Sequence, residues 1–153
     1  MSSARAQANH KLYLARILMA SWSESLAREE IPASVLAEAF DTSARAQLVA
    51  AYGWFLLEVT APGSMPAIPP QCCADLPPPA TGKMLPPEIR EFQKLESSGW
   101  LADLLSGEND PSLGSAAHNN LARAPTAQPQ KIEQWAHELE LLFERMSDSL
   151  DEY

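Results

Sequence analysis

The chain has 153 residues, the length of one domain and enough to bury a single hydrophobic core. Hydrophobic residues make up 46% of it and charged residues 20%, an ordinary globular composition. With 20 acidic against 11 basic residues, the formal net charge is -9. This balance argues against nucleic-acid binding, which depends on Lys and Arg neutralising phosphates, and it favours a basic partner.

No stretch approaches the roughly 20 apolar residues that span a bilayer, and residues 1–10 lack the apolar centre of a signal peptide. We therefore expect a cytoplasmic protein without membrane association. The two cysteines, Cys72 and Cys73, are adjacent, a spacing that suits neither a disulfide nor a zinc site. We expect them to be reduced thiols in a loop.

Apolar residues spaced three and four apart predict a first helix over residues 3–30, with a stripe of Ala8, Leu12, Ala15, Met19, Trp22 and Leu26. A second helix should open at Pro32 or be capped by Ser34. Its stripe consists of Leu36, Phe40, Ala44, Leu48, Ala51, Phe55 and Val59. A kink at residues 41–43 and a close helix contact at Gly53 are both compatible with this segment. The short link between the two helices predicts an antiparallel hairpin.

Residues 61–87 hold nine of the chain's 13 prolines. They predict a long connection that crosses the molecule or is partly disordered. A third helix is expected from Pro87, with a break at residues 97–99 and Ser98 capping a short helix through Leu105. A polar loop over residues 107–128 should follow.

A final helix is predicted over residues 129–151, with a stripe of Ile132, Trp135, Leu139, Leu142, Met146 and Leu150. Its other face is acidic and carries Glu133, Glu138, Glu140, Glu144 and Asp148. We expect its stripe to pack against Leu12, Ala15, Met19 and Trp22 of the first helix. The predicted fold is all-α, one domain over residues 1–153. It is an irregular four-helix bundle with a long proline-rich crossover between the second and third helices.

Two histidines have candidate roles. Arg5 and His10 form an Arg-x-x-x-x-His pattern that resembles the signature of the HEPN ribonucleases, which are helical bundles. The resemblance implies RNA cleavage by the pair at a dimer interface, although this pair lies in the first ten residues and not near the end of the domain. The residues around His137 resemble the motif of histidine phosphotransfer domains. Glu140 and Leu141 stand where that motif has Lys and Gly, which disfavours this interpretation.

Three patches resemble a bacterial family of small uncharacterised helical proteins that opens with an Asn-x-Lys-Leu-Tyr-Phe-Ala helix. They are residues 9–16, residues 98–105 and the closing helix, and the chain has Leu14 where the family has Phe. The resemblance implies a bacterial cytoplasmic protein and assigns no activity.

No residue pattern predicts a cofactor or a metal, because there is no Glu-x-x-His pair, phosphate loop or nucleophile motif. We therefore expect a non-enzymatic binding or protein-interaction module without catalytic residues. Its partner should be a protein, for which the net charge favours a basic one, and a homodimer is compatible with the sequence. The alternative is a HEPN-like ribonuclease that uses Arg5 and His10.

Overall fold

The computed structural model describes residues 3–106 and 129–151 of the chain. Within these ranges it contains five α-helices, one 3₁₀ helix and no β-strand, so the all-α prediction is confirmed there. The elements are α1 (Ala4–Arg28), α2 (Ala33–Thr60), η1 (Cys73–Asp75), α3 (Glu88–Ser98), α4 (Trp100–Ser106) and α6 (Pro129–Asp151). The predicted polar loop over residues 107–128 lies outside the described residues.

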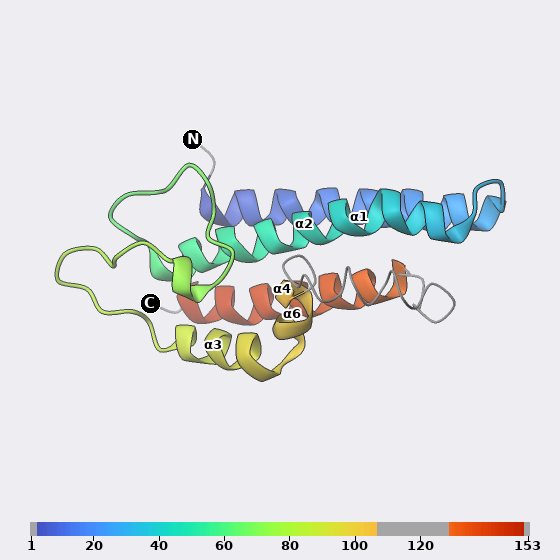
Figure 1. The fold of residues 1–153 in the computed structure, drawn as a ribbon. Coiled ribbons are helices and arrows are strands. Elements are labelled where there is room, and N and C mark those ends of the chain that lie inside the picture. The colour runs from blue at the N-terminus through green and yellow to red at the C-terminus, as the bar shows by residue number, and fades with distance from the viewer. Residues whose placement is uncertain (1–2, 107–128, 152–153) are drawn as a thin grey trace.

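Helices α1 and α2 form the predicted antiparallel hairpin (Figure 1). The Ser3 hydroxyl caps α1 by accepting the Ala6 N–H at 3.1 Å, and Glu29 ends the helix in a left-handed conformation. Pro32 occupies the N-cap position of α2, and no side chain caps that helix. Of the two predicted starts, the structure therefore has the one at Pro32 and not the Ser34 cap. Helix α2 is continuous through residues 41–43, where the sequence allowed a kink.

The described helices of the second half of the chain begin and end close to their predicted bounds. Helix α6 covers the predicted residues 129–151. The break after α3 is present, but Ser98 is the last residue of α3 and does not cap α4. Its hydroxyl donates to the Lys94 carbonyl at 3.3 Å, which is an interaction inside α3. Gly99 then joins α3 to α4 in an extended conformation.

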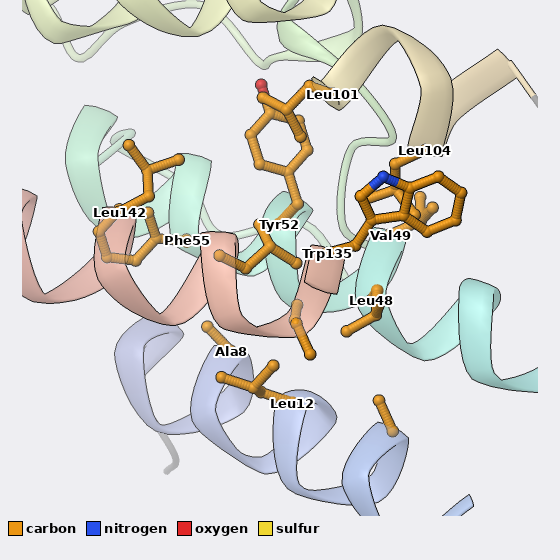
Figure 2. Packing of buried hydrophobic residues seen from close by; sticks show 14 of the residues in the cluster. Ala8, Leu12, Leu48, Val49, Tyr52, Phe55, Leu101, Leu104, Trp135 and Leu142 are labelled. Atoms are coloured by element: carbon orange, nitrogen blue, oxygen red, sulfur yellow. The ribbon is translucent and has the colours of Figure 1, made fainter. Parts of the chain in front are cut away.

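The core is formed where α6 lies against both helices of the hairpin (Figures 1 and 2). The α1 residues predicted to face α6 are buried, as are five of the six residues of the predicted α6 stripe: Ile132, Trp135, Leu139, Leu142 and Met146. We predicted that the apolar stripe of α6 packs against α1 alone, but α2 also packs against α6. The Phe55 ring of α2 stacks on the Phe143 ring of α6 with centroids 4.2 Å apart.

The proline-rich connection (residues 61–87) contacts both α2 and α3. A Cβ atom on Gly53 of α2 would lie 2.0 Å from the Pro70 carbonyl oxygen. The close contact predicted at Gly53 therefore exists, but it is made by the connection and not by another helix. Further along, the Cys73 N–H donates to the Glu96 carboxylate of α3 at 2.9 Å. These two contacts fix the connection between α2 and α3.

Candidate functional site

A cavity of about 420 Å³ opens between α1 and α6, and we call it the α1–α6 groove. Its floor is apolar and aromatic, formed by Leu12, Phe55 and Phe143. The rims are polar, and their residues are Arg5 and Asn9 on α1 and Glu140, Glu144, Ser147 and Asp148 on α6. Because α1 and α6 are antiparallel neighbours of one core, residues near the start and end of the chain meet here (Figure 1).

Two arginines of α1 form ion pairs across this seam. The Arg5 guanidinium bridges Glu58 of α2 and Asp151 of α6, with N–O distances of 3.3 Å to each. The hydrogen bond to Asp151 raises the pKa of Arg5 above its usual value. Eleven residues further along α1, Arg16 pairs with Glu140 of α6. Both arginines therefore neutralise acids that lie near the groove.

Between these two arginines the charges are unbalanced. Glu144 and Asp148 are exposed, and neither has an ion-pair partner within residues 3–106 and 129–151. The α1 positions of this part of the groove hold Asn9 and Leu12, which carry no charge. The middle of the groove is thus acidic above an apolar floor, and no Lys or Arg of α1 or α2 forms an ion pair with Glu144 or Asp148 there.

The acidic residues of α6 also destabilise this helix. Glu140, Glu144 and Asp148 are four residues apart, and like charges at this spacing repel by about 0.2–0.5 kcal/mol per pair. Asp148 and Asp151 lie near the C-terminus of α6, where the helix dipole favours cations, and the last turn contains no basic residue. A feature that costs stability and has no structural compensation is typical of a functional surface.

The sequence matches a family of unknown function, DUF6586, over residues 1–153. The chain belongs to this family. The expected membership in a family without an assigned activity is thereby confirmed. Comparisons with curated proteins and with solved structures gave no match. Since the family has no assigned chemistry, only the residues of this DUF6586 member itself indicate a function.

The structure does not bring Arg5 and His10 together within the chain. Arg5 is half-buried and held by two carboxylates, whereas His10 is exposed on the back of α1. Five residues along an α-helix correspond to a rotation of about 140°, so the two side chains point in different directions. His137 is exposed on α6.

The cysteines of this DUF6586 member lie in different environments. Cys73 is buried, with its Sγ 3.7 Å from the Tyr52 hydroxyl, and burial together with Glu96 raises its pKa to about 12. Burial also raises the pKa of Tyr52 far above its usual value. Cys72 is half-buried and its Sγ lies 3.5 Å from a carboxylate oxygen of Asp75. A protonated, buried thiol is a poor nucleophile, which disfavours a reactive role for Cys73.

Other features of the described residues offer less for function. No group of three His, Cys, Asp or Glu side chains there is arranged to hold a metal ion. None of the described helices combines the length and apolar character that crossing a bilayer requires. A second groove, between α3, α4 and α6, measures about 430 Å³, and its Arg145 already pairs with Glu91 at 2.6 Å.

The acids of the groove were recognised in the sequence as the polar face of the last helix, but the groove was not. Asn9 and Leu12 belong to one of the patches that carry the family resemblance, yet no local pattern pairs them with Glu144 and Asp148. That pairing depends on how α6 is rotated and shifted against α1, which is a property of the tertiary packing. The sequence signal for the groove is the uncharged pair Asn9 and Leu12, which follows Arg5 and precedes Arg16 at helical spacings of three and four residues.

Proposed function

We propose that this protein is a non-enzymatic interaction module of the bacterial cytoplasm, built as an irregular four-helix bundle, which binds a basic protein partner along α6. The observation that carries the proposal is the uncompensated acidic charge of Glu144 and Asp148 above the apolar floor of the α1–α6 groove. Charge complementarity steers a basic partner to such a surface, and apolar contacts then hold it there.

The net charge of the chain supports the same conclusion. A surface with a formal charge of -9 attracts basic proteins and repels phosphate backbones over several ångströms at physiological salt. The acids on α6 outnumber the basic residues of that helix, which are Lys131 and Arg145. Arg145 is moreover paired with Glu91, so α6 presents mainly negative charge.

Affinity capture from the native cell tests this proposal, with the full chain as bait. We expect a basic protein to be retained at low salt and released at high salt. It should also be lost from a bait in which the acids of the polar face of α6 are neutralised, namely Glu133, Glu138, Glu140, Glu144 and Asp148. Circular dichroism of that bait checks that it remains helical. Failure to capture a partner, or a partner that binds both baits equally, would contradict the proposal.

The ribonuclease alternative has less support from the geometry. The guanidinium of Arg5 is occupied by Glu58 and Asp151, and the groove beside it is acidic, which repels an RNA backbone. RNA cleavage by the purified chain that is abolished by His10→Ala would favour the alternative over the interaction module.

A further inference from the structure

The α1–α6 groove has the features of a pocket for one cationic side chain. Resting on the proposed interaction function, we infer that the groove binds an arginine side chain of the partner, whose guanidinium lies between Glu144 and Asp148. Three observations lead to this assignment, and they concern charge, shape and the way in which this protein itself neutralises its acids.

The ion pairs between α1 and α6 form a series that is interrupted in the middle. On α1, the side facing α6 carries Arg5, Asn9, Leu12 and Arg16 at spacings of four, three and four residues. Both arginines of this row form ion pairs with acids of α6. Only the two middle positions of the row lack a cation, and Glu144 and Asp148 line the groove at that place. A cation supplied from outside would complete the series.

The shape of the groove favours a long side chain with an apolar stem. Its volume of about 420 Å³ exceeds what a single bound ion or a few water molecules need. The floor consists of Leu12, Phe55 and Phe143, each with under a tenth of its surface exposed. Arginine and lysine both pack a methylene stem on apolar surface while the charged group remains at the polar rim.

Arginine fits better than lysine because the acids form a pair. A guanidinium is planar and presents five N–H donors, so it bridges two carboxylates, whereas an ammonium is a compact and strongly hydrated charge. Arg5 provides the example within this protein, since one guanidinium contacts both Glu58 and Asp151 at 3.3 Å. Glu144 and Asp148 are one helical turn apart on the same edge of α6, which suits the same type of bridge.

The test uses the purified full chain and three capped peptides of equal length, in which leucine alternates with arginine, with lysine or with citrulline. Citrulline has nearly the shape of arginine but no charge. Binding is followed by amide shifts in two-dimensional NMR spectra. We expect the arginine peptide to bind more tightly than the other two and to shift amides of residues 5–12 and 140–148.

Two variants of equal charge locate the site. Glu144→Gln with Asp148→Asn should weaken binding of the arginine peptide about tenfold, the effect of losing two charge pairs at a partly exposed site. Glu133→Gln with Glu138→Gln removes the same charge from the same helix outside the groove, and should change binding less than about twofold.

A third variant supplies the missing cation from within the chain. Asn9→Lys lies on an exposed position of α1 and should preserve the helix, because lysine has the higher helix propensity. It should weaken arginine-peptide binding as strongly as the loss of the two acids. Equal binding of the citrulline peptide, or equal losses in the two acid variants, would overturn the inference. A captured native partner that ignores Glu144 and Asp148 but needs Glu133 and Glu138 would overturn it too, and would leave the interaction function standing.

Discussion

Gly53 illustrates how a single residue determines where the proline-rich connection lies. Glycine inside a helix is less stable than alanine by about 1 kcal/mol, so its presence in α2 requires a reason. The reason is the Pro70 carbonyl oxygen, which occupies the space that a Cβ atom would need. The backbone of the connection can therefore approach the axis of α2 at this point, and Pro70 becomes buried there.

We expect Gly53→Ala to destabilise the protein by about 1–2 kcal/mol, although alanine is the better helix former. Overpacking a core typically costs about 1–3 kcal/mol, and here the obstacle is a backbone carbonyl that cannot rotate away. Urea unfolding followed by circular dichroism measures the change. Gly63→Ala is the matched control, because its Cβ would meet only ordinary contacts at 3.8 Å, and its stability should be nearly unchanged. A more stable Gly53→Ala variant would show that the connection does not rest on α2.

The buried pair of Tyr52 and Cys73 predicts a loss of stability at alkaline pH. The unfolded thiol has its ordinary pKa of 9.0, whereas the pKa of the folded thiol is about 12. Between these values the folded state keeps a proton that the unfolded chain releases, so the free energy of unfolding decreases as pH rises. Tyr52, with its raised pKa, adds to the loss above its ordinary value of 10.0.

Urea unfolding at neutral pH and at about pH 10.5 should therefore show a lower midpoint at the higher pH. The double substitution Cys73→Ala with Tyr52→Phe should flatten this dependence, even if its stability at neutral pH is lower. Tyr13→Phe, which removes the hydroxyl of an exposed tyrosine, should retain the wild-type slope. A double variant with the full wild-type slope would assign the alkaline loss to other groups.

The 3₁₀ helix η1 was not predicted, and among the long helices the burial of α6 was predicted most completely and that of α2 least. The apolar stripe of α6 has spacings of three and four residues with acids opposite, and a helix with one buried face follows that pattern. Helix α2 begins in the same way but is buried on several sides from Leu48 to Thr60. Leu56 and Leu57, which lie beside the predicted stripe, are fully buried there. An apolar stripe in the sequence cannot predict the burial of these two residues. Their burial depends on α6, α3 and the proline-rich connection, which meet around α2.

The orientation of α6 can be tested with neighbouring substitutions. Leu139→Ala removes a fully buried side chain and should cost about 2–5 kcal/mol of stability. Glu140→Ala loses the half-exposed ion pair with Arg16 and should cost at most about 1 kcal/mol. Urea unfolding of both variants, compared at the same temperature, gives the difference directly. Similar losses in the two variants would mean that the wrong face of α6 has been assigned to the core.

At the scale of the whole molecule, the sequence specifies the amount of charge but not its distribution. The excess of nine acids follows from counting, and so does the expectation of a basic partner. The row of α1 that neutralises α6 at Arg5 and Arg16, and leaves Glu144 and Asp148 uncompensated between them, exists only after the two helices pack. The basic partner is therefore a prediction from composition, whereas the groove could be located only with the structure.

The same distribution of charge predicts how stability responds to salt. Six ion pairs within the described residues join groups in direct contact, at separations below 4 Å. The surplus acids repel one another over much longer distances. Raising the NaCl concentration from about 0.01 M to about 0.1 M shortens the screening length from about 30 Å to about 10 Å, which weakens the long-range repulsion much more than the contact pairs. The midpoint of thermal unfolding, measured by circular dichroism, should therefore shift upward by about 2–4 °C over this range, equivalent to ~1 kcal/mol for a chain of this size.

The variant Glu144→Gln with Asp148→Asn has two fewer acids, so it should melt higher at low salt and gain less from added salt. A melting temperature that falls as salt is added would instead mean that the ion pairs of Arg5, Arg16 and Arg145 outweigh the repulsion. The uncompensated acids would then cost the fold little, and the argument that they are retained for a partner would lose its energetic support.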